Sequence, residues 1–276
     1  LLFGVSGAVG VSASACIFLG MVEAPLLIRP LIPRLSRGEI FIIMVDGLSV
    51  VAGSNMIFLG AILNQRFPGA FTHFLTASLI STPLAIGIAR AIVPVGAGGR
   101  DILTLETQYK SGLDALTQGA LNGVKMAVGI AALLIVFVGA TDLINQGLAL
   151  LPHAGAPLSL SAILGWLFSP VAWLMGVPSP DIRNVAALLG TRVSINEVVA
   201  YSQFAAPGLV LSAKAAHIAL YALCSFGNIG SVAILIGALT AMAPERAGEI
   251  APLGFRALLA AFIASCVTGA IIGIVA

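Results

Sequence analysis

The chain has 276 residues, of which 59% are hydrophobic and only 9% are charged, and its mean hydropathy is +1.09. No water-soluble domain could expose so apolar a surface, so the composition indicates an integral membrane protein. The formal net charge is only +2, and the basic residues are too scattered to form a face for nucleic acid. The three cysteines are dispersed in apolar segments, which excludes a disulfide framework or a zinc site.

The first element is a helical hairpin over residues 6 to 34. Its small, apolar sequence reaches Gly20, and Glu23 and Pro25 follow directly. A straight span would leave Glu23 in lipid, at a cost of roughly 3 kcal/mol for a carboxylate at mid-membrane. A re-entrant hairpin with its tip near Gly20 avoids that cost, because its non-helical backbone lines a polar cavity. Since the chain opens in mid-pattern at Leu1, we expect earlier membrane segments to precede it.

Three further elements follow the first hairpin. Residues 40 to 63 form a long span that holds Asp46, Gly47, Gly53, Ser54 and Asn55, and this polar cluster indicates that the helix breaks there. Residues 71 to 94 form a second span, and the polar stretch up to residue 118 is an aqueous loop with some helix. Residues 119 to 152 form the longest apolar element, which can cross a bilayer with tilt.

The same order of elements is then predicted again. Residues 160 to 176 form an interfacial helix with tryptophan anchors, residues 181 to 206 a second hairpin, residues 215 to 242 a second broken helix, and residues 253 to 275 a final span. The segments Gly53–Ala61 and Gly230–Ala238 share a Gly-Ser-x-x-Ile pattern. The chain therefore divides into two repeats, 1 to 118 and 158 to 276, on either side of the long helix.

Loop charges predict the topology. The loops at 29 to 39, 90 to 118 and 243 to 257 carry eight basic residues, whereas the opposite connections hold only Arg66 and Lys214. The first set is therefore cytoplasmic, and an odd number of crossings separates the two hairpins. The predicted fold is an all-α polytopic membrane protein with inverted repeats, two re-entrant hairpins and two broken helices. This pattern is typical of secondary transporters that bind solute at the repeat interface.

Two acids and one helix break carry the candidate chemistry. Glu23 and Glu197 each follow a hairpin tip, and an ionisable group inside a membrane is a functional candidate. A structural partner such as Arg192 would be the alternative explanation for Glu197. Asn228 and Ser231 lie at the second break, where freed backbone groups bind polar solutes. Phe226 offers an aromatic face there, or packs only.

Motifs along nearly the whole chain resemble those of the concentrative nucleoside transporter family. In chain order they are Gly20-x-x-Glu23-Ala24-Pro25-Leu26-Leu27-Ile28-Arg29-Pro30, Val51-Ala52-Gly53-Ser54, Asn196-Glu197-x-Val199-Ala200-Tyr201 and Tyr221-Ala222-Leu223-Cys224-x-Phe226-x-Asn228. The resemblance implies an elevator-type transport domain, a homotrimeric scaffold that includes residues 119 to 152, and inward nucleoside transport across a bacterial plasma membrane. It also implies that the N-terminal scaffold helices are missing from this sequence.

The resemblance also implies a substrate site. Glu197, Asn228 and Ser231 would hold the ribose, and Phe226 would pack beside the nucleoside. Glu23 would lie on the base side, where the family pattern Gly-Gln-Thr-Glu is replaced by Gly-Met-Val-Glu. The full set of expected substrate-binding residues is Met21, Val22, Glu23, Asn55, Asn196, Glu197, Phe226, Asn228 and Ser231.

The positions that bind sodium in sodium-coupled members are degenerate here. Cys16 and Val50 replace an asparagine and a serine, which leaves backbone carbonyls near Leu19, Val50 and Val51. A hard cation needs several oxygen ligands. We therefore expect coupling to protons, with Glu23 or Glu197 as the carrier, and no cofactor or bound metal.

Two functions other than nucleoside transport are alternatives. The loss of polar groups at Met21 and Val22 favours a related carrier of a different polar solute. A membrane enzyme would need a nucleophile, base or metal cluster, but the histidines are dispersed and no catalytic spacing occurs. The sequence therefore predicts a transporter and no enzyme.

Overall fold

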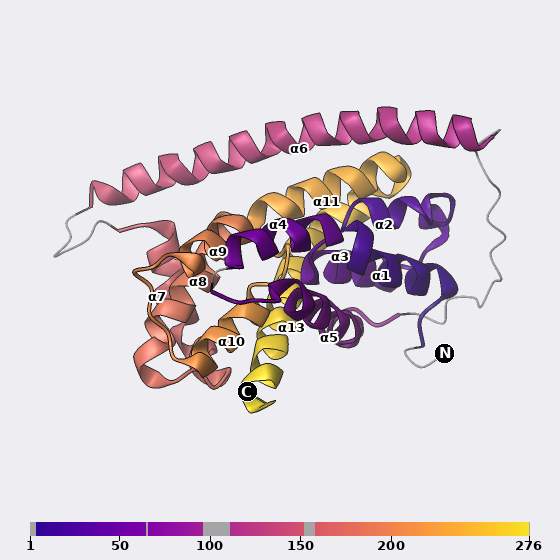
Figure 1. Cartoon of the computed structure of the whole chain (residues 1–276). Coiled ribbons are helices and arrows are strands. Elements are labelled where there is room, and N and C mark those ends of the chain that lie inside the picture. Colours follow the sequence, from indigo (N-terminus) through magenta and orange to yellow (C-terminus); the bar gives the residue numbers. More distant parts are fainter. Residues whose placement is uncertain (1–3, 65, 96–110, 152–157, 276) are drawn as a thin grey trace.

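The computed structural model describes residues 4–64, 66–95, 111–151 and 158–275, and within these ranges it is helical with no strand (Figure 1). The predicted loop at 96 to 110 lies outside them. The α-helices are α1 (Gly7–Leu19), α2 (Glu23–Leu26), α3 (Arg37–Ser49), α4 (Gly53–Leu63), α5 (Ala70–Ile92), α6 (Gly112–Ala149), α7 (Leu160–Leu174), α8 (Ile182–Ser194), α9 (Glu197–Ala205), α10 (Ala213–Ala222), α11 (Ile229–Met242), α12 (Ala247–Ile250) and α13 (Gly254–Val275). Short 3₁₀ turns include η1 (Arg29–Arg34) and η3 (Pro244–Arg246).

Polar caps set several helix starts. Ser36 and Glu39 form a reciprocal capping box, in which the Ser36 hydroxyl accepts from the Glu39 N–H and the Glu39 carboxylate accepts from the Ser36 N–H. The first broken helix therefore begins at Arg37, slightly before the predicted residue 40. Ser212 caps α10 and is held in turn by Asp181, so that helix also starts slightly before its predicted bound of 215.

Two pairs of short helices turn at the predicted residues. Helices α1 and α2 pack together around residues 20 to 22, and α8 and α9 pack together around Ile195 and Asn196. Gly20 has a φ of 106°, a conformation that side chains rarely adopt. A Cβ there would lie 3.1 Å from the Ala52 Cβ. The glycine therefore lets the first tip approach the helix break that follows it.

Both predicted helix interruptions are present, and they brace each other. Helices α3 and α4 are separated by residues 50 to 52, and α10 and α11 by residues 223 to 228. The Phe226 N–H donates to the Val50 carbonyl over 3.2 Å, and the Ser225 hydroxyl donates to the Leu48 carbonyl over 2.7 Å. Each break therefore satisfies backbone groups that the other exposes.

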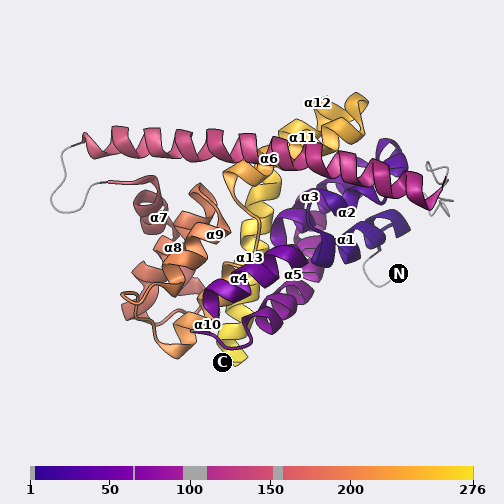
Figure 2. The same cartoon turned by 45° about the horizontal axis from the view of Figure 1, so that its top comes forward.

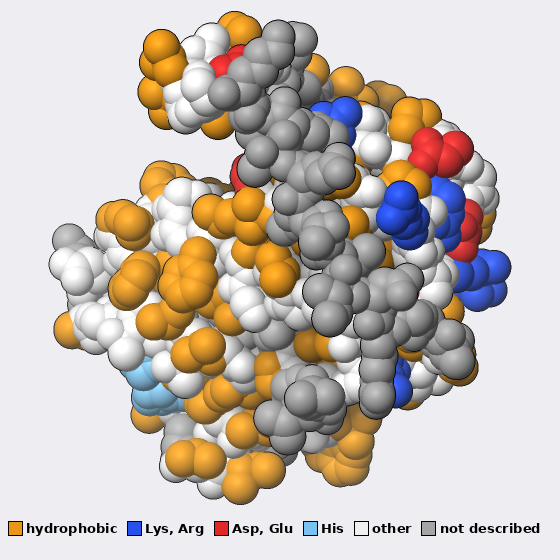
Figure 3. Space-filling model, turned by 90° about the vertical axis from the view of Figure 1, so that its right-hand side faces the viewer, with side chains coloured by type: hydrophobic (Ala, Val, Ile, Leu, Met, Phe, Trp, Pro, Cys, Tyr) orange, Lys and Arg blue, Asp and Glu red, His pale blue; other side chains and the backbone are white. Residues whose placement is uncertain are grey.

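The body is built around α13, which packs against α3, α5 and α10. Three stretches within the described residues are long and apolar enough to cross a membrane, namely 37 to 63, 70 to 92 and 244 to 275. Hydrophobic side chains also cover much of the face in Figure 3, while charged ones gather toward one edge. A surface of this kind suits a lipid environment.

Helix α6 differs from the prediction at its start. It begins at Gly112, not at 119. The Ser111 hydroxyl accepts a hydrogen bond from the Asp114 N–H and so caps the helix, and the polar turn that follows is helical. The expected boundary between the first repeat and the long helix thus falls inside α6. The helix lies along one side of the body, where it contacts α11 and α7 (Figures 1 and 2).

Candidate functional site

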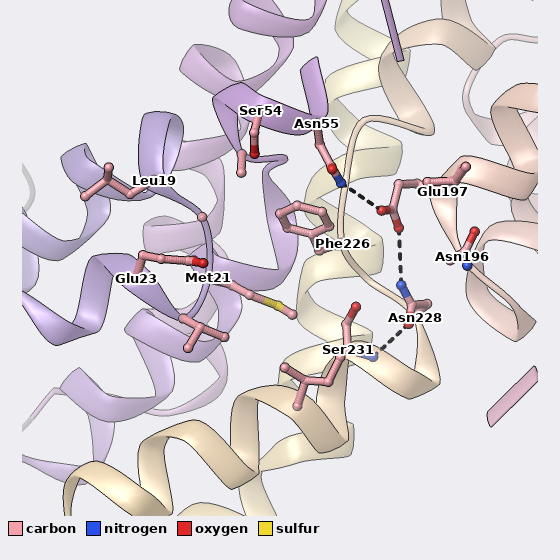
Figure 4. A pocket seen from close by; sticks show the side chains of 15 residues that line it. Leu19, Met21, Glu23, Ser54, Asn55, Asn196, Glu197, Phe226, Asn228 and Ser231 are labelled. Carbon is pink, nitrogen blue, oxygen red and sulfur yellow. Dashed lines mark hydrogen bonds between the residues drawn. The ribbon is translucent and has the colours of Figure 1, made fainter. Parts of the chain in front are cut away.

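A cavity of about 310 Å³ lies where both helix pairs and both breaks meet. This volume is at the lower end of small-molecule pockets. Its lining contains all nine of the expected substrate-binding residues (Figure 4). The lining residues are Leu19, Gly20, Met21, Val22, Glu23, Ala52, Ser54, Asn55, Asn196, Glu197, Val198, Phe226, Asn228, Ser231 and Ile234.

The Glu197 carboxylate is the polar centre of this cavity. It is only 5% exposed. Its Oε1 accepts from Asn55 Nδ2 over 3.2 Å, and its Oε2 accepts from Asn228 Nδ2 over 3.3 Å. Asn55 belongs to α4 and Asn228 precedes α11, so an amide from each broken helix holds the same acid (Figure 4).

Four helices begin at the cavity wall. Glu23 and Glu197 are the first residues of α2 and α9, and Ser54 and Ser231 lie in the first turns of α4 and α11. Helix N-termini carry partial positive charge and unpaired N–H groups. The cavity is therefore suited to a solute rich in oxygen acceptors.

Asparagine caps two of these helices. Asn196 Oδ1 accepts from the Val199 N–H over 2.9 Å, and Asn228 Oδ1 accepts from the Ser231 N–H over 2.7 Å. Asn196 thus lines the cavity while its oxygen is committed to the start of α9. Asn228 has two roles, since its oxygen caps α11 while its amide group donates to Glu197.

The wall opposite Glu197 is mostly apolar. Met21 and Val22 are buried at the first tip, whereas Glu23 is exposed. The Glu23 carboxylate folds back over Gly20, where its Oε2 would lie 3.0 Å from a Cβ. Figure 4 places Glu23 and Glu197 on opposite sides of the cavity. The two acids therefore occupy different environments.

Phe226 and Arg192 answer two questions left open by the sequence. Phe226 lies between the two walls and packs against both hydrophobic cores, so it lines the cavity and packs at once (Figure 4). Arg192 is fully buried, but it donates to the Ala222 carbonyl and the Ser265 hydroxyl and lies over the Phe262 ring. It forms no salt bridge with Glu197 in the described structure.

The expected ion positions lie around the first tip. Leu19 lines the cavity, whereas Cys16, Val50 and Val51 are buried behind it. The Val50 carbonyl already accepts from Phe226, and the Cys16 carbonyl accepts from the Gly20 N–H over 3.2 Å. The Val50 carbonyl, one of the few oxygens that could bind a cation here, is therefore already used in a hydrogen bond.

Ser54 is a lining residue that the expected set lacked. It follows Gly53 in the first copy of the Gly-Ser-x-x-Ile pattern, in the same register as Ser231 in the second copy. The internal repeat was the signal that could have identified it.

Comparison with known proteins places this chain and its fold among membrane transporters. A family model described as "Na+ dependent nucleoside transporter C-terminus" matches residues 73–273. The chain belongs to the concentrative nucleoside transporter family, whose members are transporters and not enzymes. It is accordingly an integral membrane protein, and its bacterial relatives support the expected location in a bacterial plasma membrane.

Similar proteins include bacterial and human members. The chain is 38% identical to "Putative nucleoside permease NupX" of Escherichia coli, over 95% of this chain and 64% of that protein. It is 36% identical to "Uncharacterized transporter YutK" of Bacillus subtilis, over 99% and 68% of the two chains. It is also 36% identical to human "Solute carrier family 28 member 3", over 96% and 41%.

A solved structure, CNTnw in an inward-facing substrate-bound state, superposes with a TM-score of 0.81. The two chains are 36% identical, and the match covers 98% of this chain and 65% of the other. The chain thus spans about two thirds of the length of its bacterial relatives, and less of the human one.

Proposed function

We propose that the protein is a secondary active transporter of nucleosides or nucleoside-like solutes. The observation that carries this proposal is the Glu197 carboxylate, which two amides from different helix breaks hold in a cavity of small-molecule size. A carboxylate oxygen keeps further lone pairs when it has accepted one hydrogen bond. It can therefore accept from the hydroxyl groups of a sugar.

The ribose would lie against Glu197, Asn228 and Ser231. These side chains form one polar side of the cavity (Figure 4). A site built to bind hydroxyl groups rejects analogues that lack them, because its own polar groups would then be left unpaired. We therefore assign recognition of the sugar to this side.

The base would lie toward Met21 and Val22. Neither side chain can donate a hydrogen bond to a base, so discrimination among bases should be weak and should depend on Glu23 and on packing. This feature also supports the alternative, a carrier of a different polar solute.

A competition assay distinguishes nucleosides from a different polar solute as the transported substrate. Uptake of radiolabelled uridine by the full-length protein in membrane vesicles is measured against purine and pyrimidine nucleosides, free bases and free ribose. Competition by both kinds of nucleoside, with little effect of the bases, supports the proposal. Uptake that free ribose or an unrelated polar solute inhibits better than nucleosides would favour the alternative.

We further infer that the two helix pairs are re-entrant hairpins in an inverted, elevator-type transport domain. Two arginines in matching places support this architecture. Arg66, just after α4, donates to three carbonyls at and beyond the end of the second pair, and Arg246, just after α11, donates to three carbonyls after the first pair. Helix α6 would belong to a trimeric scaffold beside this domain.

Proton coupling is favoured over sodium coupling. The family description names sodium, but Cys16 and Val50 offer no side-chain oxygen, and the Val50 carbonyl is engaged by Phe226. Glu23 and Glu197 are the cavity carboxyls able to carry a proton. Uptake should follow an imposed pH gradient without sodium, and uptake that needs a sodium gradient and ignores the pH gradient would contradict this.

A further inference from the structure

A second buried acid lies outside the cavity. Asp46 is in α3, one turn before the break, and is 1% exposed among the side chains of the first hydrophobic core. Its Oδ1 is fully buried without a hydrogen-bond partner in the described part of the chain. The Oγ1 of Thr82 in α5 is also buried and has no hydrogen-bond partner there. The proposed substrate site uses neither side chain.

The first tip covers the turn of α3 that carries Asp46. A Cβ on Gly47 would lie 3.0 Å from the Met21 Cβ and 3.4 Å from its Cα, so the tip rests directly on this turn. Thr82 lies beside the carboxyl group, and the Cys16 thiol is within its electrostatic reach. Asp46 therefore lies between α5 and α1, next to the residue of α3 on which the tip rests, and the tip also forms the apolar wall of the cavity.

A charged carboxylate at this position lacks a counter-charge. The Thr82 hydroxyl could donate one hydrogen bond, and a bridging water could add another, but neither would neutralise the charge. An uncompensated buried ion costs several kcal/mol. The carboxyl group is therefore stable here only if it is protonated or if it binds a cation.

Among the described residues, the elements that pack against α3 offer no nearby cationic side chain that could pair with a charged Asp46. In the described structure α11 carries no ionisable side chain, Glu23 of α2 is exposed, and Glu249 of α12 is paired with Arg246. His73 and Arg90 of α5 are more than two turns from Thr82, and Arg256 of α13 is exposed. The ionisable groups on these elements are Cys16, Glu23, His73, Arg90, Glu249, Arg256 and Cys266.

We propose that Asp46 is a proton-binding site whose proton is exchanged when the α1–α2 tip moves off α3. A carboxyl, a hydroxyl and a thiol give too few oxygens for sodium, whereas a single carboxyl is enough for a proton. With the tip seated, the protonated acid is sealed in the core. When Met21 withdraws from Gly47, the carboxyl group opens toward the cavity and can release the proton.

This inference rests on the proposed transport function and adds a proton carrier to the two cavity acids. The test compares Asp46→Asn with Glu39→Gln, a buried acid that is satisfied in its capping box. Full-length protein in liposomes is assayed for accumulation driven by a pH gradient and for solute exchange without a gradient. A gradient of about one pH unit supports about tenfold accumulation when one proton accompanies each solute.

The expected result is that Asp46→Asn exchanges solute but loses the pH-driven accumulation, while Glu39→Gln behaves like the wild type. If Asp46→Asn accumulates solute as well as the wild type does, the inference is overturned and the proposed function stands. If the wild type itself shows no pH-driven accumulation, the proposed coupling fails, and infrared spectroscopy decides the inference instead.

The infrared measurement follows the C=O stretch of a protonated carboxyl group during a pH titration. A titrating band that is present in the wild type and absent in Asp46→Asn supports the proton site, and a wild type without that band overturns it. Thr82→Val leaves the acid in place. Since it removes the hydroxyl that could donate to the carboxylate once the proton has left, it should move the loss of the band to higher pH, and an unchanged titration would count against the site.

Discussion

At the scale of single residues, one acid joins the two halves of the site. Glu197 and Asn55 are 142 positions apart, yet the Asn55 side chain donates a hydrogen bond to the Glu197 carboxylate. The sequence identified both residues, because an acid and an amide in apolar segments are unusual, but it could not show that they meet. Asn228 adds the second amide and also fixes the start of α11, so the geometry of the acid depends on a helix cap.

Two substitutions separate the roles of Asn228. Asn228→Ala removes both the cap and the bond to Glu197, whereas Asn228→Ser keeps a hydroxyl cap and removes only the bond. Both should abolish saturable uptake, and only Asn228→Ala should also lower stability, by about 1 kcal/mol. Uptake kinetics and thermal unfolding in detergent measure the two effects. Wild-type uptake by Asn228→Ser would show that the amide bond to Glu197 is not needed.

At the scale of elements, the first tip and the first break fit closely. A Cβ on Gly53 would lie 3.1 Å from the Phe18 carbonyl oxygen, and one on Gly47 would lie 3.0 Å from the Met21 Cβ. Small side chains at these points let a non-helical tip lie against a helix end. The position of Met21 in the cavity wall therefore depends on the backbone of α3.

Gly47→Ala tests this packing. The added methyl group should push the tip by a few tenths of an ångström toward the cavity, and a loss of about 1.4 kcal/mol in binding would weaken solute affinity about tenfold. The control is Gly87→Ala in α5, where a Cβ meets nothing within 4 Å. It should leave uptake unchanged, since the added methyl group displaces no neighbour. Alanine also forms a helix better than glycine by about 1 kcal/mol, so α5 is not destabilised. Equal affinities in both variants would contradict the close fit.

Helix starts and breaks were largely predictable, and the contacts between them were not. Glycine, proline and polar clusters indicated the tips and breaks, since they oppose a continuous helix in an apolar segment. The early start of α6 was missed because a polar turn after Ser111 resembles a loop, although the serine cap was a signal. The bond from Ser225 to the Leu48 carbonyl joins two breaks and depends on the folded chain.

At the scale of the whole molecule, each half of the chain holds a segment beside the helix pair of the other half. Arg66 donates to the carbonyls of Phe204, Ala206 and Leu209, and lies over the Phe204 ring. Arg246 donates to those of Ile32, Pro33 and Leu35, and pairs with Glu249. The internal repeat predicted two similar units, and these hydrogen bonds show that neither helix pair is held only by its own half of the chain.

Arg66→Gln and Arg246→Gln should each lower the free energy of unfolding. Hydrogen bonds to a charged group contribute about 1.5 to 3 kcal/mol, and each arginine makes more than one. Arg256→Gln, an exposed site on α13, is the control and should change stability by about 0.5 kcal/mol or less. Thermal unfolding of the full-length protein in detergent measures all three. Losses no larger than that of the control would contradict the fastening role.

The proposed transport of nucleosides depends above all on binding of the solute by Glu197. Uptake of radiolabelled uridine and adenosine into liposomes that contain the full-length protein tests it most directly, with Glu197→Gln compared against Glu39→Gln. We expect saturable uptake by the wild type and by Glu39→Gln, and none by Glu197→Gln despite normal membrane insertion. Undiminished uptake by Glu197→Gln, or no nucleoside uptake by the wild type, would contradict it.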